Sequence, residues 1–177
     1  AGMGDDVRKL EGKTILISGG AGFIGSYIVA LINELNRQKL SKKCSIISLD
    51  SYISGKKSRL SGLNIDENFI KLIKADVTKP IKINKKIDYI IHAAGIASPI
   101  YYQKYPVETI ESAIFGAKYL LELSREKKVK SFLFFSSSEI YGDPDIKHLP
   151  TSEDYKGNVS STGPRSAYDE SKRLGES

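Results

Sequence analysis

The 177-residue sequence contains no tryptophan, one methionine, two histidines and a single cysteine, Cys44. One cysteine cannot form an internal disulfide, so a disulfide-stapled scaffold is excluded and a reducing, cytoplasmic setting is favoured. No stretch approaches the roughly 20 apolar residues that a membrane-spanning helix needs, so we expect no membrane partner. Nothing in the sequence predicts a metal site.

Acidic residues are outnumbered: 27 Lys and Arg against 21 Asp and Glu give a net charge of +6. The basic residues are dispersed and do not gather on one helix with aromatic side chains between them. This pattern favours a solvated basic surface, or attraction of an anionic nucleotide, over nucleic-acid binding. The basic segments are 36–43, 56–59, 79–86 and 125–130.

We divide the chain into a tail, residues 1–12, and a single domain, residues 13–177. The tail is polar and charged and has no signal-peptide core. Ala1 and Gly2, which precede Met3, resemble a cloning remnant. The remaining length suffices for one domain with a sizeable core.

Short apolar runs alternate with segments of helical periodicity along this domain. Such alternation predicts an α/β fold, a Rossmann doubly wound parallel sheet with helices on both faces. Loops are expected at 99–106, at 144–164 and at 51–67, the last with at most one helical turn. We expect strands at 14–18, 44–49, 69–74, 87–92 and 131–135, and helices at 24–40, 107–127 and 166–176.

The first strand ends in a glycine-rich turn that leads directly into a helix. Its spacing fits Gly20-x-Gly22-x-x-Gly25 and also the variant that begins at Gly19. Glycines there allow a tight turn, a close backbone approach to a pyrophosphate and close helix–strand packing, although such a turn can also be purely structural. The turn and helix start therefore predict a dinucleotide-phosphate site at Gly19, Gly22, Phe23, Ile24 and Gly25.

Acidic residues follow the second and third expected strands. Asp50 is placed to accept hydrogen bonds from an adenosine ribose, which favours NAD over NADP, or else to cap its own turn. Asp76, followed by Val77, could bond the adenine amino group or equally cap a turn.

The fourth strand ends at His92 and leads into Ala93 and Ala94, whose small side chains would let the backbone pass close to the dinucleotide. We interpret His92 as hydrogen-bonded scaffold rather than as a general base.

Tyr168 and Lys172 are four residues apart on the last expected helix and therefore point the same way. A tyrosine with an ordinary pKa near 10 is a poor base, but a neighbouring ammonium and a positive nicotinamide ring favour the phenolate. Ser137, after the fifth strand, could bond the same substrate oxygen. The pattern predicts a device that removes a hydroxyl proton while hydride leaves for NAD.

In combination these motifs resemble the extended short-chain dehydrogenase/reductases, the NAD-dependent nucleotide-sugar epimerase/dehydratase family. The resemblance runs from about Gly12 to the last residue. It implies bound NAD, a nucleotide-sugar substrate, a transient 4-keto sugar and a homodimer paired through residues 107–127 and 166–176. The residues that carry it are 19–25, 92–94, 136–144 and 168–173.

Within that family the chain looks most like the UDP-glucuronate decarboxylases, which produce UDP-xylose. The resemblance implies catalytic roles for Ser137, Glu139, Tyr168 and Lys172. It also implies substrate contacts in the loops and turn that resemble theirs, at Ser98, Ser138 and Arg165.

The sequence also departs from the pattern. Ala113 stands where the family usually has asparagine, and Gly95-Ile96 replaces a Ser-Pro pair. Ser138 stands where 4,6-dehydratases carry aspartate, which disfavours dehydration.

Other outcomes stay open at this stage: a 4-epimerase, a dTDP-glucose 4,6-dehydratase, or a non-enzymatic NAD-binding regulator or scaffold. Family members are about twice as long, and their C-terminal half builds the sugar-nucleotide site. We therefore expect this chain to lack the C-terminal substrate part, to bind NAD and to turn over substrate poorly.

Overall fold

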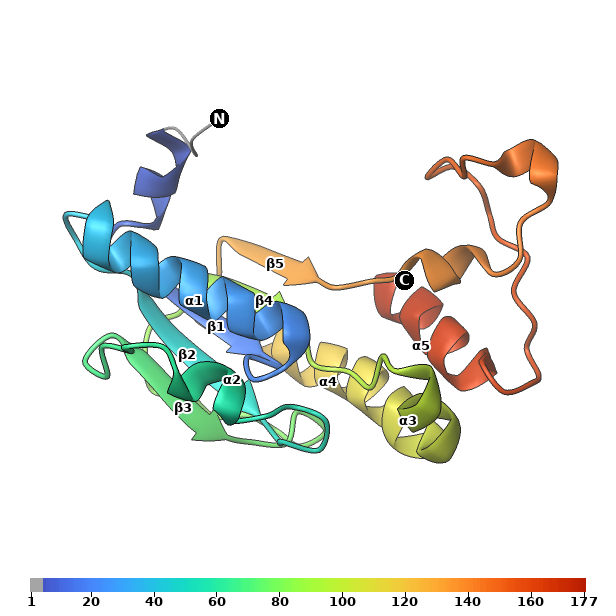
Figure 1. Cartoon of the computed structure of the whole chain (residues 1–177), viewed down its shortest axis with the longest axis horizontal. Helices are drawn as coiled ribbons and strands as arrows, with labels where there is room; N and C mark the ends of the chain where they lie inside the picture. The colour runs from blue at the N-terminus through green and yellow to red at the C-terminus, as the bar shows by residue number, and fades with distance from the viewer. Residues whose placement is uncertain (1–4) are drawn as a thin grey trace.

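The computed structural model describes residues 5–177 and contains a five-stranded parallel sheet in the order β3-β2-β1-β4-β5 (Figure 1). In its central register, Leu16 of β1 lies opposite Ile47 of β2 and Ile90 of β4. The chain winds outward from β1 to β3 and then crosses back to β4, so the winding reverses beside β1. Ligands bind at such a reversal, outside the carboxyl ends of the strands. The strands are β1 (Thr14–Ser18), β2 (Ser45–Asp50), β3 (Ile70–Lys74), β4 (Tyr89–His92) and β5 (Ser131–Phe134).

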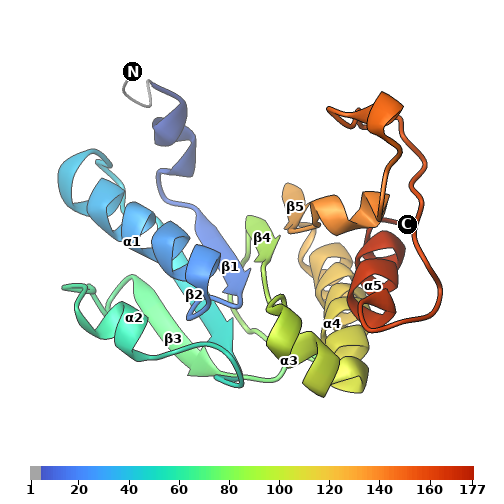
Figure 2. The same ribbon diagram turned by 45° about the vertical axis from the view of Figure 1, so that its right-hand side comes forward.

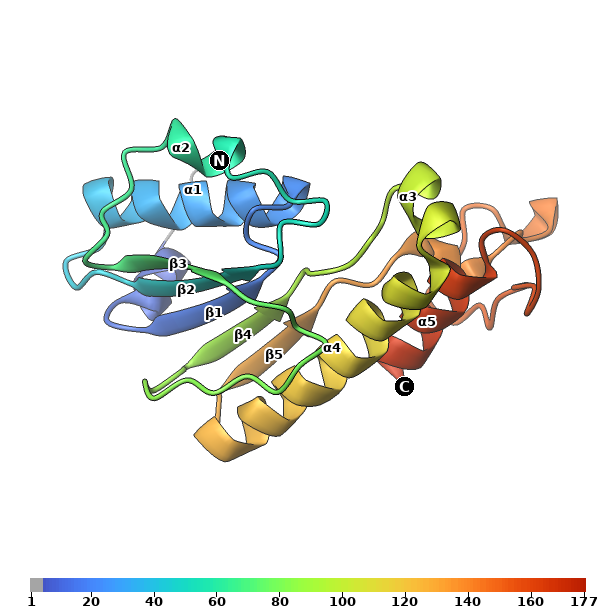
Figure 3. The same ribbon diagram turned by 90° about the horizontal axis from the view of Figure 1, so that it is seen from below.

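Helices cover both faces of the sheet, as the sequence predicts. The helices α1 (Phe23–Gln38) and α2 (Ser58–Ser61) lie on one face, and α4 (Pro106–Lys127) crosses the other (Figure 3). The last helix, α5 (Ser166–Glu176), packs beside α4 past the end of β5 (Figure 2). Among the described residues, no helix is both long and apolar enough to cross a membrane.

Alternation along the strands builds one apolar cluster on each face. In β1, Ile15 and Ile17 pack against α1, whereas Leu16 points to the other face and packs with Leu120 of α4. Successive side chains of a strand point to opposite faces, so a strand covered on both sides is apolar throughout. The central strands β1 and β2 are buried for this reason, whereas in β3 only Ile70 is buried and β5 is partly exposed.

One segment differs from the sequence-based prediction. Residues 99–106 were expected to be a loop, but Pro99–Lys104 forms helix α3. Pro99 occupies the first helical turn, where its fixed φ and missing N–H are tolerated. Tyr102 is buried against Tyr168 of α5, and this contact between distant segments stabilises the helix.

Three short 3-10 helices complete the chain: η1 (Asp5–Leu10), η2 (Ser138–Tyr141) and η3 (Ile146–His148). Val7 and Leu10 of η1 pack against the core, so this part of the predicted tail is structured. The expected loop at 144–164 contains η3, and the expected helical turn within 51–67 is α2.

Candidate active site

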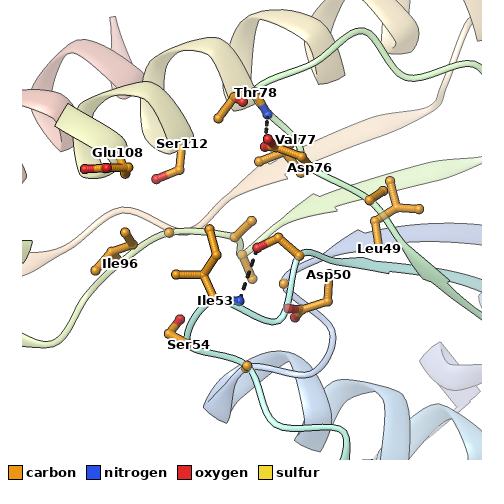
Figure 4. Close-up of a pocket in the computed structure, with 18 of the residues that line it drawn as sticks. Leu49, Asp50, Ile53, Ser54, Asp76, Val77, Thr78, Ile96, Glu108 and Ser112 are labelled. Carbon is orange, nitrogen blue, oxygen red and sulfur yellow. Dashed lines mark hydrogen bonds between the residues drawn. The ribbon is translucent and has the colours of Figure 1, made fainter. Parts of the chain in front are cut away.

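A cleft of about 730 Å³, including its open mouth, lies at the carboxyl ends of β1, β2 and β4 (Figure 4). Its walls come from the glycine turn, the segments after β2, β3 and β4, and the first half of α4. The lining residues with a predicted role are Gly19, Gly22, Asp50, Asp76, Val77, Ala93 and Ala94.

The glycine turn approaches the neighbouring backbone too closely for a side chain. Gly19 has a φ of +76°, and a Cβ there would lie 2.7 Å from the carbonyl atoms of Ala93. A Cβ at Gly25 would meet the Gly19 carbonyl oxygen and lie 2.9 Å from the Gly20 Cα atom. Each glycine is required by a backbone contact, which confirms the structural part of the prediction.

The N-terminus of α1 opens at this turn without a capping side chain. Gly22 is its N-cap residue, no side chain caps it, and its first turn holds no acidic residue. The first N–H groups of a helix lack intrahelical partners and carry partial positive charge. This terminus is therefore suited to a phosphate, and the glycine-rich turn before it has no side chains that would fill the space for one.

Asp50 is buried at the end of β2 and organises two turns at once. Its Oδ2 accepts from the N–H of Ala21 at 2.9 Å, and its Oδ1 accepts from the N–H of Tyr52 at 2.8 Å. The backbone of Gly55 lies against the same carboxylate, where a Cβ would come within 2.6 Å of Oδ1. The predicted turn-capping role is thus present. Each oxygen keeps a second lone pair that could accept a ribose hydroxyl.

Asp76 lies exposed after β3. Its Oδ1 accepts from the N–H of Thr78 at 2.9 Å, so its turn-capping role is also present, and Val77 beside it is buried (Figure 4). Ala94 donates its N–H to the Ser18 hydroxyl at 3.4 Å, which fixes the small-residue segment beside β1.

His92 is buried in the sheet as scaffold. Its Nδ1 lies 2.7 Å from the Ser18 hydroxyl, and its ring packs at 5.6 Å from that of Phe134. Burial, and secondly the charge of Lys172, lower the pKa of His92 to about 4. It is therefore neutral at physiological pH.

Tyr168 and Lys172, on α5, are not among the residues that line the cleft, but both lie close to residues that do. Tyr168 is buried against Ile96, which lines the cleft, and stacks on Tyr102 with ring centroids 5.0 Å apart. The Nζ of Lys172 lies 5.9 Å from the centroid of the Tyr168 ring and 3.7 Å from the position that a Cβ of Gly95 would occupy. Burial lowers the pKa of Lys172 to about 8. The pair therefore stands where the segment after β4 meets the cleft.

The segment after β5 brings a second polar group beside α5. The Ser137 hydroxyl accepts from the N–H of Glu139 at 3.2 Å and caps η2, which packs against α5. Glu139 pairs with Arg165, whose Nε lies 3.6 Å from Oδ2 of Asp169. Burial raises the pKa of Asp169, and Arg165 opposes that shift. The structure thus joins Ser137, Glu139 and Arg165, and adds Asp169, to which the sequence analysis gave no role.

Residues 15–177 match the family described as NAD dependent epimerase/dehydratase. The chain belongs to this family. The glycine turn, Asp50 and the Tyr168–Lys172 pair all lie within the matched range.

Relatives and solved structures agree on the family and differ in their reactions. UDP-glucuronic acid decarboxylase 5 of Arabidopsis thaliana is 43% identical over 162 residues, covering 92% of this chain and 44% of that protein. UDP-glucuronic acid decarboxylase 1 of Danio rerio is 36% identical over 170 residues, covering 96% of this chain and 38% of that protein. The chain therefore spans less than half the length of these relatives.

Two epimerase structures are similar to it at 26% identity. UDP-glucose 4-epimerase of Bifidobacterium longum, in complex with NAD+ and UDP, gives a TM-score of 0.69 over 93% of this chain and 47% of that one. UDP-N-acetylglucosamine 4-epimerase of Methanobrevibacter ruminantium M1, in complex with UDP-N-acetylmuramic acid, gives 0.75 over 94% and 49%.

Several site residues predicted for this epimerase/dehydratase domain lie outside the cleft. Phe23 and Ile24 have exposed side chains in the first turn of α1, so only their backbone N–H groups suit a phosphate. Ser98 is the N-cap residue of α3, and Ser138 is exposed in η2. Their substrate contacts stay predictions.

Other residues also line the cleft. Ser51, Ile53, Ser54 and Gly55 do so from the turn after β2, whose sequence resembles the cofactor-binding turn of the decarboxylases, and ligands bind at that edge of the sheet. The α4 residues Glu108, Glu111 and Ser112 reach the cleft through tertiary packing, and no sequence signal indicates them. Figure 4 shows Glu108 and Ser112 there.

Proposed function

We propose that this chain binds NAD in the cleft. The uncapped α1 N-terminus would hold the pyrophosphate, and the second lone pairs of Asp50 would accept the adenosine ribose hydroxyls. A 2′-phosphate would meet that carboxylate, so NAD is favoured over NADP. The acidic residues Asp76, Glu108 and Glu111 at the same cleft add to this preference by repulsion.

We further propose an oxidoreductive step at a sugar hydroxyl, carried by one observation: α5 places Lys172 beside Gly95 at the cleft, with Tyr168 on the same face. Bound NAD would supply a hydride acceptor for the sugar C4 position and give the hydride back at the end. Tyr168, as phenolate, would take the C4 hydroxyl proton, and the Lys172 ammonium would stabilise that phenolate. The Ser137 hydroxyl would bond the same oxygen.

For the substrate we propose UDP-glucuronate, decarboxylated to UDP-xylose. Identities of 36–43% to UDP-glucuronic acid decarboxylases support this choice. A ketone at C4 makes the C6 carboxylate a β-keto acid. Its C5–C6 bond breaks, CO₂ leaves, and the electron pair forms an enolate whose oxygen Tyr168 and Ser137 would stabilise. Glu139 would assist protonation at C5, and Arg165 would hold Glu139 in place.

This activity is proposed for a protein of the relatives' length, in which the sugar site is complete. Products from a panel of UDP- and dTDP-sugars, identified by mass spectrometry, would test it: UDP-xylose and CO₂ from UDP-glucuronate are expected. Tight NAD binding with no change in any sugar nucleotide would instead favour a regulator or scaffold.

A UDP-sugar 4-epimerase is the second candidate, favoured by the solved epimerases with TM-scores of 0.69 and 0.75. It needs no acid at C5, so a Glu139→Gln variant that keeps full activity would support epimerisation.

We also propose a homodimer paired through α4 and α5, where Leu121 and Leu174 are exposed beside a shared groove. Sedimentation analysis would test it.

A further inference from the structure

Phe134, the last residue of β5, lies between the sheet and α5. Its ring centroid is 4.9 Å from the Nζ of Lys172 and 5.6 Å from the centroid of the His92 ring. The Lys172 Nζ also donates to the carbonyl oxygen of Phe135 at 2.6 Å. Within residues 5–177 this carbonyl is its only hydrogen-bond acceptor, and the Lys172 Nζ lies closer to the Phe134 ring than to the Tyr168 ring.

Gly175 makes room for this ring. It follows Lys172 by three residues, so both lie on one face of α5. A Cβ at Gly175 would meet the tip of the Phe134 ring and lie 2.9 Å from its Cε1 and 3.2 Å from its Cε2. Glycine is a poor helix former, costing about 1 kcal/mol relative to alanine. Its presence inside α5 is explained by the ring that occupies the space.

We propose that Phe134, seated against Gly175, is a positioning residue that holds the Lys172 ammonium beside Gly95 and favours its charged form. The inference rests on the proposed function only in the use of Lys172 to activate Tyr168. The packing of Phe134 against Gly175 and Lys172 does not depend on that function. A cation over an aromatic face is attracted by the ring quadrupole, and the attraction is strongest when both groups are desolvated.

Apart from the Phe135 carbonyl, which accepts a hydrogen bond from Lys172, the other groups around Lys172 leave this role to the ring. His92 of β4 is neutral because its pKa is lowered to about 4. Tyr168 lies on the same helix, with Tyr102 of α3 stacked on it. The α4 carboxylates at the cleft, Glu108 and Glu111, form no ion pair with Lys172, and neither does any other described residue.

The titration of Lys172 in the 177-residue chain tests the proposal. Lysine side chains labelled with ¹³C at Cε would be followed by NMR from pH 6 to 11, in the wild type and in Phe134→Leu. We expect the Lys172 pKa, about 8 in the wild type, to fall by about one unit. Phe132→Leu is the matched control: Phe132 lies two residues earlier on the same strand and packs in the cluster with Leu120 and Leu123. Among the described residues Lys172 lies over the rings of Phe134 and Tyr168 and not over Phe132, so Lys172 should titrate in this variant as in the wild type.

Gly175→Ala is the second variant, because Phe134→Leu removes core volume and could unfold the chain. The added methyl group tilts the ring off Lys172 while the rest of α5 gains helix propensity. A fall in the Lys172 pKa in a folded variant supports the positioning role of Phe134. An unchanged Lys172 pKa, or a rise because water enters the site, overturns the proposal. NAD binding, measured in parallel by calorimetry on the wild type, reports on the proposed function separately.

Discussion

Replacing Gly19 with alanine should damage both the fold and the cleft. Gly19 combines a φ of +76° with a Cβ position 2.7 Å from the carbonyl carbon and oxygen of Ala93 and from the nitrogen of Ala94. Those atoms belong to the backbone where β4 ends, so they cannot move aside as a side-chain tip would. The sheet must therefore separate locally at the point where β1 and β4 meet the cleft.

The magnitude follows from two separable costs. A left-handed conformation costs a non-glycine residue about 1–2 kcal/mol, and an overpacked contact costs about 1–3 kcal/mol more. Gly12→Ala isolates the first cost: its φ is +64°, and its Cβ would meet only Lys42 side-chain atoms at 3.8 Å and beyond. We expect Gly19→Ala to lower the free energy of unfolding by roughly 2–5 kcal/mol and Gly12→Ala by roughly 1–2 kcal/mol.

Urea unfolding followed by circular dichroism would measure both variants, with calorimetric titration of NAD beside it. In a chain of this size 1 kcal/mol corresponds to about 2–4 °C in melting temperature, so the two variants are readily distinguished. Gly12→Ala should bind NAD as the wild type does, and Gly19→Ala should not. Equal stability of the two variants would refute the argument, because the close backbone approach at Ala93 would then have no energetic consequence.

Other predictions address charge and chemistry. His92→Gln should flatten the pH dependence of stability between pH 6.5 and 4. Between the folded-state His92 pKa of about 4 and its unfolded-state pKa of about 6.5, the native state binds fewer protons than the unfolded state. The free energy of unfolding of the wild type therefore falls by up to about 3 kcal/mol as the pH drops through that window. Urea titrations of both proteins at several pH values measure how much of this fall the variant loses. Asp50→Asn should weaken NAD binding about tenfold and reduce the preference over NADP, as calorimetry with both cofactors would show; an unchanged NAD-to-NADP ratio would contradict it. Tyr168→Phe, in a protein of the relatives' length, should keep NAD affinity and the stacking on Tyr102 while turnover drops about 10²–10⁴-fold; retained turnover in a product assay would remove the phenol from the mechanism.

The sequence was most informative where the structure depends on neighbouring residues. The apolar run ending at Ser18 and the glycines after it specify strand, turn and helix within a few residues, so the glycine-rich turn between β1 and α1 was predictable. The position of Asp50 followed equally simply, because all parallel strands end at one edge. The spacing of Tyr168 and Lys172 fixed their common face, although not what they contact.

The remaining features depend on contacts between distant segments. Helix α3 forms where Tyr102 packs on Tyr168, 66 positions further along the sequence by their residue numbers. A tyrosine-rich stretch flanked by prolines carries no local sign of that partner. The same holds for Glu139 beside Arg165 and for Phe134 against Gly175. Each pair is chemically ordinary in the sequence and acquires its role only when α5 packs on the sheet edge.

The two halves of the site are consequently held by different kinds of contact. The dinucleotide half consists mainly of backbone approaches among β1, α1 and β4, which exclude a Cβ, together with the Asp50 carboxylate. The α5 half depends on side chains that cross between elements: Lys172 on the Phe135 carbonyl, and Arg173 on the carbonyls of Ile140 and Lys156 at 2.7 and 3.0 Å. Substitutions at these contacts would shift the positions of Tyr168 and Lys172 together while leaving the glycine-rich turn between β1 and α1 intact. A family built on one cofactor can therefore change its reaction through the α5 half without rebuilding the half that holds the cofactor.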